Sequence, residues 1–226
     1  KFFPAEKIIM TGNPVRQNLF GHSVSREEAV RYFSLDPSKK TILILGGSLG
    51  ARIINRTLTA GLDIIRQNPD IQFIWQTGKI YIDQVRDAIT TAVGEAVHHP
   101  HINAIPNLYV TDFIKDMANA YAAADLVISR AGAGSISEFC LLHKPVILVP
   151  SPNVAEDHQT KNALALVDKD AAIYVKDVEA QEKLLPVALA TVKDSGKLKE
   201  LSNNIAKLAL PDSATIIAKE VLKLIK

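Results

Sequence analysis

The stretch TILILGGSLG, residues 41–50, joins a run of apolar residues to a glycine-rich turn, and a helical pattern follows it. A short, continuous run of Ile and Leu is typical of a strand that is covered on both faces of a sheet. The chain repeats this design in DLVISRAGAGS, residues 125–135. Because strands that alternate with helices form βαβ units, the two stretches predict a parallel α/β sheet.

Similar apolar runs extend this sheet in both directions along the chain. We expect strands at 7–10, 41–45, 71–75, 108–111, 125–129, 145–150 and 172–175. Helical patterns lie near 25–34, 51–67, 79–92, 115–124, 135–143, 157–169 and 179–193, and two more, at 196–209 and 212–225, end the chain. The pattern predicts a Rossmann-like parallel sheet with helices on both faces, plus C-terminal helices.

Composition places the chain among globular proteins. Of its 226 residues 47% are hydrophobic and 22% charged, and the net charge of +2 gives no bulk field for nucleic acid, so we expect no nucleic-acid partner. The segment 193–226 is locally basic, which is typical of a solvated helical face. No apolar run reaches the length of a membrane span, and the chain is therefore expected to be soluble. Because it begins with Lys1 rather than Met, we expect a preceding segment in the gene product.

The lone Cys140 excludes an intramolecular disulfide and lies in the apolar run FCLL, which predicts a buried, inert thiol. Three histidines, His98, His99 and His101, flank Pro100. They invite a metal hypothesis, but a surface loop is the favoured interpretation, because no Cys or carboxylate pattern accompanies them.

The two glycine-rich turns predict an anion site. Glycine permits a positive φ and close backbone approach, and a helix N-terminus presents unpaired N–H groups. Two such turns at the carboxyl edge of one sheet favour a phosphorylated ligand, although each could simply be a tight turn. Neither stretch has the Gly-Lys-Ser/Thr ending of a Walker A motif or the G-x-G-x-x-G of a dinucleotide fingerprint, which disfavours an NAD-dependent oxidoreductase.

Three further features could complete such a site. Glu138 could accept hydrogen bonds from a ribose diol, or it could form a capping box with Ser135. Arg16, held after Pro14, could pair with a phosphate or lie free on the surface. A polar cluster after the 145–150 strand could contact sugar hydroxyls or merely cap a helix; it comprises Asn153, Glu156, Asp157, His158, Gln159 and Asn162.

Taken together, these motifs resemble those of the MurG family of peptidoglycan-synthesis glycosyltransferases, and they match its C-terminal, donor-binding half. The matching stretches are TGNPVR (11–16), GGSLGAR (46–52), DFI (112–114) with Asp116-Met117, SRAGA (129–133) running to Glu138, and DHQ (157–159) with Asn162-Ala163.

The resemblance implies one half of a GT-B fold, a UDP-N-acetylglucosamine donor, and inverting transfer to the lipid-linked muramoyl-pentapeptide called lipid I, to give lipid II. It implies that Ser48 and the backbone of Ala133, Gly134 and Ser135 hold the diphosphate and that Arg16 neutralises it. Ile114 would meet uracil through its backbone, and Glu138 would bind the ribose. His158 and Gln159 would contact the sugar, and Ile136 and Ser137 complete the donor-binding stretch.

The family's other half has no counterpart in this sequence. By resemblance, that N-terminal domain of the same protein carries the acceptor site and the general base, so we expect no catalytic residue, no metal and no cofactor in this chain. We expect a linker with a first strand at 1–20, the nucleotide-sugar domain at 21–193 and C-terminal helices at 194–226. The protein would be cytoplasmic, and at full length peripheral on the cytoplasmic face of the bacterial inner membrane.

Three alternatives remain open at this point. The chain could belong to another GT-B glycosyltransferase or to a UDP-sugar 2-epimerase. It could also be a non-enzymatic nucleotide-binding module whose basic tail docks on an anionic surface.

Overall fold

A computed structural model of the chain describes residues 3–16, 19, 24–96 and 102–225. Six parallel strands form one sheet in the order β3-β2-β1-β4-β5-β6. The strands are β1 (Lys40–Leu45), β2 (Ile71–Gln76), β3 (Leu108–Thr111), β4 (Leu126–Ser129), β5 (Val146–Leu148) and β6 (Ile173–Tyr174). This order confirms the predicted Rossmann-like architecture.

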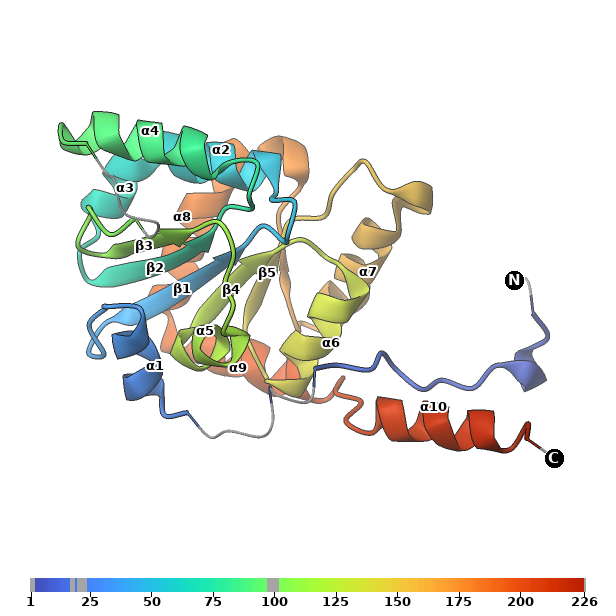
Figure 1. Cartoon of the computed structure of the whole chain (residues 1–226). Coiled ribbons are helices and arrows are strands. Elements are labelled where there is room, and N and C mark those ends of the chain that lie inside the picture. The colour runs from blue at the N-terminus through green and yellow to red at the C-terminus, as the bar shows by residue number, and fades with distance from the viewer. Residues whose placement is uncertain (1–2, 17–18, 20–23, 97–101, 226) are drawn as a thin grey trace.

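Helices connect the strands and end the chain (Figure 1). They are α1 (Arg26–Tyr32), α2 (Arg52–Ala60), α3 (Leu62–Arg66), α4 (Ile82–Val93), α5 (Met117–Ala123), α6 (Ala133–Leu141), α7 (His158–Val167), α8 (Ala180–Lys193), α9 (Ser195–Ala206) and α10 (Ser213–Leu222). Short 3-10 helices lie at η1 (Ala5–Lys7), η3 (Ala155–Asp157) and η4 (Asp177–Glu179).

Alternation along β1 divides the core into two layers. Ile42 and Ile44 face a cluster built from α2, α3, α4 and α8. Leu43 and Leu45 face the opposite cluster, which contains side chains of α1, α5, α6, α7 and α9. Successive strand residues point to opposite faces, so a continuous apolar run buries both sides of the strand.

The strand order also fixes where the two glycine-rich turns lie. From β1 the chain builds β2 and β3 on one side, and it then returns to place β4 directly against the other side of β1. Ligands of doubly wound sheets bind at the carboxyl ends of strands where the order reverses. The turns after β1 and β4 flank this switch point.

Three predicted elements differ in the structure. The expected strand at 7–10 is absent from the sheet: Ile8, Ile9 and Met10 follow η1 and are exposed, with no neighbouring strand to pair with. The expected helix 51–67 breaks into α2 and α3 at Gly61, where a Cβ would lie 2.1 Å from Leu185 Cδ1 of α8. Helix α6 begins at Ala133, two residues earlier than expected.

Residues 3–12 and helix α10 project from the same side of the sheet domain (Figure 1). The two segments approach each other at Gly12, which lies so close to Leu210 and Ser213 that a Cβ there would overlap both side chains. The projection carries exposed apolar residues, namely Phe3, Ile8, Ile9, Met10, Val221, Leu222, Leu224 and Ile225.

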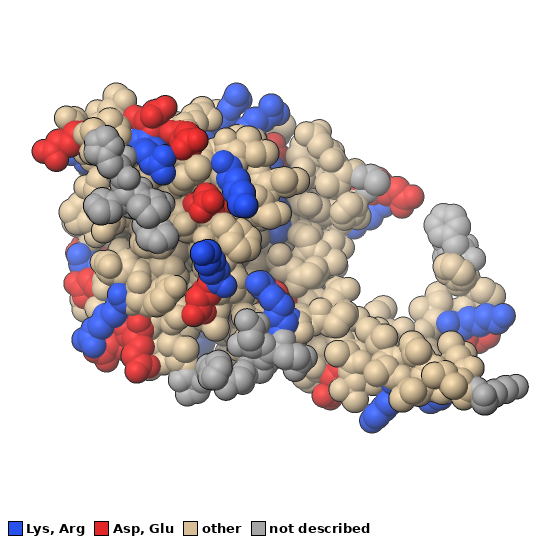
Figure 2. Space-filling view, in the orientation of Figure 1, with Lys and Arg blue, Asp and Glu red and all other residues tan. Residues whose placement is uncertain are grey.

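Figure 2 shows Lys and Arg interspersed with Asp and Glu over one face of the molecule. Among the residues that the structure describes, no helix has both the length and the apolar character needed to cross a membrane.

Candidate nucleotide-binding site

The two glycine-rich turns meet at one cavity of about 240 Å³. Ser48 from the first turn and Ser135 from the second both line it. Of the predicted site residues, the cavity brings together Arg16, Ser48, Ile114, Ser135, Glu138 and Gln159. Residues separated by more than a hundred positions in the sequence therefore share one wall at the switch point.

The first turn depends on glycine at a close backbone approach. Gly50 has a φ of +79°, and a Cβ there would lie 2.3 Å from the carbonyl oxygen of Thr77. A side chain would therefore push the turn away from the end of β2 and displace Ser48 from the cavity. Helix α2 starts directly after this turn, at Arg52.

The second turn merges with the first turn of α6. Gly132 is the N-cap, and the first intrahelical bond runs from the Ile136 N–H to the Gly132 carbonyl. The N–H groups of Ala133, Gly134 and Ser135 precede that bond and so have no acceptor within the helix. They form the N-terminal end of α6, where helices in other proteins bind anions. The alternative capping box of Ser135 and Glu138 is wrong, because the helix has already started at Ala133 and Glu138 bonds elsewhere.

The Glu138 carboxylate is buried, with 8% of the residue exposed. Its Oε1 accepts from Arg16 Nε at 2.9 Å, and its Oε2 accepts from Arg16 Nη2 at 3.1 Å and from the Tyr121 hydroxyl at 2.6 Å. This carboxylate therefore has three donors, all from side chains.

Arg16 thus contacts Glu138, the residue that the resemblance assigns to the ribose, while also lining the cavity. Its hydrogen bonds to Glu138 raise the pKa of the guanidinium, which stays charged. The segment that carries Arg16 is held against α6 by Asn13, whose Nδ2 donates to Ser137 Oγ at 3.1 Å. Arg16 is half exposed, so it has room to turn toward a ligand.

The apolar end of the cavity is formed by Ile114, Phe113 and Met117. The Ile114 N–H donates to Gln76 Oε1 at 3.2 Å, so its backbone is fixed at this end of the cavity. Sequence reasoning missed Gln76. Its signal was a polar residue at the last position of a buried strand, where doubly wound sheets place ligand contacts.

A larger hollow of about 650 Å³ adjoins the first cavity and shares Gly46, Gly47, Ser48, Arg130 and Gln159 with it. Gln159 Oε1 accepts from the Ser151 N–H at 2.9 Å, which fixes its side chain at the boundary. Arg130 is held by the carbonyls of Val149 and Pro150 and by Asp177. The polar cluster after β5 therefore reaches this rim through Gln159 and Asn153.

Other predicted residues do not line the 240 Å³ cavity. Ile136 and Ser137 line a separate hollow of about 150 Å³ beside Leu210 and Ser213. His158 is exposed at the start of α7. Asp157 stands at the N-cap of that helix, but its side chain makes no capping bond. Ala133 and Gly134 would act through their N–H groups rather than through side chains.

Two smaller predictions concern metal and thiol chemistry. His98, His99 and His101 lie outside the described residues. Within the ranges that the structure describes, no group of three His, Cys, Asp or Glu side chains could hold a metal ion. Cys140 is buried as predicted, and this burial raises the pKa of its thiol to about 11, so it is not a reactive thiolate at neutral pH.

A Rossmann-like sheet whose switch point carries paired helix N-termini, an apolar end and a buried carboxylate has the architecture that α/β domains use to hold nucleotides. Residues 41–217 match the model of the glycosyltransferase family 28 C-terminal domain. The chain belongs to this family.

Individual relatives agree with the family match. The chain is 74% identical over 224 residues to a UDP-N-acetylglucosamine--N-acetylmuramyl-(pentapeptide) pyrophosphoryl-undecaprenol N-acetylglucosamine transferase of Bacteroides fragilis, covering 99% of this chain and 56% of that protein. It is similar to the crystal structure of MurG from Acinetobacter baumannii, with a TM-score of 0.70, 26% identity, and coverage of 98% of this chain and 58% of that chain.

A UDP-GlcNAc 2-epimerase from Neisseria meningitidis, bound to UDP-GlcNAc, has a TM-score of 0.60 at 16% identity, with 88% of this chain and 48% of that chain covered. At that identity the likeness shows a shared fold alone. The resemblance to the MurG family is thus confirmed, and the alternatives of a 2-epimerase or a different GT-B enzyme have fold-level support only. The chain spans somewhat more than half the length of the curated relatives that it matches.

Proposed function

We propose that this chain is the donor-binding half of a transferase that moves N-acetylglucosamine from UDP-N-acetylglucosamine to lipid I, giving lipid II. The observation that carries the proposal is the single cavity lined by Ser48, Ser135 and Glu138. It supplies anion-binding backbone at one end and a diol acceptor at the other, which is the chemistry of a nucleoside diphosphate. The activity for which the Bacteroides fragilis relative is named supports the particular reaction.

In this proposal the uridine lies in the 240 Å³ cavity. Uracil is read by the carbonyl of Ile114, and the ribose diol donates to Glu138. The diphosphate sits between Ser48 and the N–H groups of Ala133, Gly134 and Ser135, with Arg16 as counter-charge. The sugar extends into the larger hollow, where Gln159 and His158 are the proposed contacts. Ile136 and Ser137 support the donor-binding turn from behind.

The proposed chemistry is a single displacement with inversion. The acceptor hydroxyl attacks the anomeric carbon, the bond from that carbon to the UDP oxygen breaks, and UDP departs with the electron pair. The N-terminus of α6 and Arg16 stabilise the charge on UDP without a metal or other cofactor. The base that removes the acceptor proton lies on the preceding N-terminal domain, so this chain alone binds donor without transferring it.

The exposed apolar side chains of residues 3–10 and of the end of α10 support a further part of the proposal. In the longer protein they lie against that preceding domain, since clustered exposed apolar groups mark contact surfaces. Segment 1–20 then serves as the linker, residues 21–193 as the nucleotide-sugar domain and residues 194–226 as the terminal helices. Lipid I is reached through the preceding domain on the cytoplasmic face of the inner membrane.

Titration calorimetry with UDP tests the proposal. We expect binding that Glu138→Ala weakens about tenfold, because each hydrogen bond to a charged group contributes about 1.5 kcal/mol or more. The same substitution should change the affinity for methyl diphosphate, which lacks ribose and base, by less than about twofold.

A matched control is Glu200→Ala, which removes an exposed glutamate that pairs with Lys197 on α9, remote from the site. It should bind UDP like the unmodified chain. A folded sample that does not bind UDP at millimolar concentration would overturn the proposal, and equal losses for both ligands would remove Glu138 from the ribose.

A further inference from the structure

The Tyr121 hydroxyl is the third donor to Glu138, and it has no role in the binding of UDP proposed above. Tyr121, on α5, is 2% exposed, and its hydroxyl donates to Glu138 Oε2 at 2.6 Å. Its ring packs edge-on against Phe139 of α6, with centroids 6.0 Å apart and planes at 80°. The hydroxyl is thus held in place by two helices that also wall the cavity.

A lone-pair count limits what Glu138 can bind at one time. A carboxylate offers about four acceptor sites. Arg16 occupies two of them and Tyr121 a third. A ribose diol brings two donors, so at least one Arg16 bond must break before both hydroxyls can bind. The released guanidinium lies in the same cavity as Ser48 and Ser135, where the diphosphate is proposed to sit.

Unlike Arg16, Tyr121 cannot move away from Glu138. Arg16 is half exposed on a segment outside the sheet, whereas Tyr121 is buried in the core layer beneath the site. When Arg16 turns away, Tyr121 remains as the donor that keeps a buried carboxylate from being unpaired, which would otherwise be costly.

We infer that Tyr121 is a positioning residue for ribose recognition: its hydroxyl holds the Glu138 carboxylate so that the edge now bonded to Arg16 is presented to the ribose diol. The inference rests on the proposed function and adds a determinant of ribose specificity to it. Burial, and then the charge of Glu138, raise the pKa of the Tyr121 phenol, so the hydroxyl stays protonated and a donor throughout the neutral range.

The test compares UDP with 2′,3′-dideoxyuridine diphosphate, which keeps the base and the diphosphate but has no diol. In the unmodified chain UDP should bind more tightly. Tyr121→Phe should lower the affinity for UDP about tenfold, which is the loss expected for one hydrogen bond to a charged group. The affinity for the dideoxy ligand should change by less than about twofold. A merely structural tyrosine would weaken both ligands equally, and that result would overturn the inference.

Two further measurements keep the test decisive. In a Glu138→Ala background, Tyr121→Phe should cause no additional loss of UDP binding, because its effect acts through the carboxylate; a further tenfold loss would contradict this. The matched control is Tyr174→Phe, which changes a partly buried tyrosine on β6 and should leave the affinity for both ligands unchanged.

The outcomes separate the proposed function from the inference. If the unmodified chain does not prefer UDP to the dideoxy ligand, the ribose role of Glu138 is wrong, and the inference is wrong with it. If that preference is present and Tyr121→Phe preserves it, only the inference fails.

Discussion

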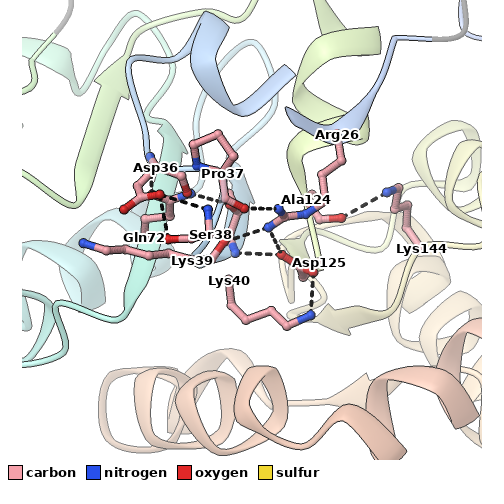
Figure 3. A network of polar contacts seen from close by, with 11 residues as sticks. Arg26, Asp36, Pro37, Ser38, Lys39, Lys40, Gln72, Ala124, Asp125 and Lys144 are labelled. Atoms are coloured by element: carbon pink, nitrogen blue, oxygen red, sulfur yellow. Dashed lines mark hydrogen bonds and ion pairs between the residues drawn. The ribbon is translucent and has the colours of Figure 1, made fainter. Parts of the chain in front are cut away.

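Two arginine–carboxylate pairs lie at opposite ends of the same part of the sheet. At the amino ends of β1 and β4, Arg26 Nη2 donates to Asp125 Oδ2 at 2.8 Å (Figure 3). At the carboxyl ends, Arg16 donates to Glu138 through two bonds. Both carboxylates are largely buried. The pairs differ in what else holds each partner.

Both members of the amino-end pair, termed the closed pair, have further hydrogen-bond partners within the fold. Arg26 also donates to the carbonyls of Pro37 and Lys39, and Asp125 also accepts from Lys40 Nζ and the Thr41 N–H. Its neighbour Lys144, whose pKa is lowered by burial, donates to the Ala124 carbonyl. Within the described part of the chain, in contrast, the Arg16 side chain donates to Glu138 alone, and it faces a cavity. A network satisfied by backbone is structural, whereas a pair beside a cavity can exchange partners with a ligand.

The largest expected effect is at the closed pair. Asp125→Ala should lower the free energy of unfolding by about 3 kcal/mol, because removal of this buried carboxylate leaves Arg26 and Lys40 without their counter-charge and the Thr41 N–H without its acceptor. Urea unfolding followed by circular dichroism measures this. UDP affinity, measured on the folded variant, should change less than about twofold, since the network lies at the opposite end of the strands.

The control for this change is Asp63→Ala, which removes an exposed carboxylate 3.8 Å from Arg66 and should alter stability by less than about 0.5 kcal/mol. A similarly small effect at Asp125 would show that the comparison between the two ends is mistaken.

The exchangeable pair should respond to substitution in a ligand-dependent way. Arg16→Gln should weaken UDP about tenfold, because a charged donor to the diphosphate is lost. Uridine, which has no phosphate, should bind at least as tightly as before, because Arg16 no longer competes for Glu138. Calorimetry with both ligands measures the two changes. Equal losses of affinity for UDP and uridine would mean that Arg16 has a structural role, as Arg26 does.

The sequence predicts the sheet well because apolar runs and glycine-rich turns are local signals. It fails at 7–10, where KIIM has the composition of a strand but no neighbour in the sheet, and at Gly61, whose close contact with Leu185 arises only on folding. The site could be predicted as a set of residues, but its partnerships could not. Neither the Arg16–Glu138 pair nor the roles of Gln76 and Tyr121 follow from spacing, because three separate elements must first pack together.

The pH dependence of stability provides another test of the amino-end pair. Burial alone would raise the pKa of Asp125, but bonds from Lys40, the Thr41 N–H and Arg26 outweigh it, and the net pKa lies below the usual 3.8. A carboxyl group whose pKa is lower in the folded state stabilises the fold above its unfolded pKa, and that contribution is lost as pH falls through the folded value. The stability difference between the unmodified chain and Asp125→Asn should therefore be constant from about pH 5 to 7 and shrink below about pH 4. A difference at pH 3 as large as the one at pH 6 would contradict this.

The smallest expected effect separates the members of the closed network. Lys40 donates to Asp125 Oδ1 at 2.9 Å but is half exposed, whereas Arg26 is also tied to two backbone carbonyls. Lys40→Met keeps the aliphatic stem and leaves Asp125 with Arg26 and the Thr41 N–H, so it should lower the free energy of unfolding by only about 0.5 kcal/mol. Arg26→Met should cost several times more, because it also frees the carbonyls of Pro37 and Lys39. Equal effects in urea unfolding would mean that charge alone, rather than the backbone bonds of Arg26, holds the amino end together.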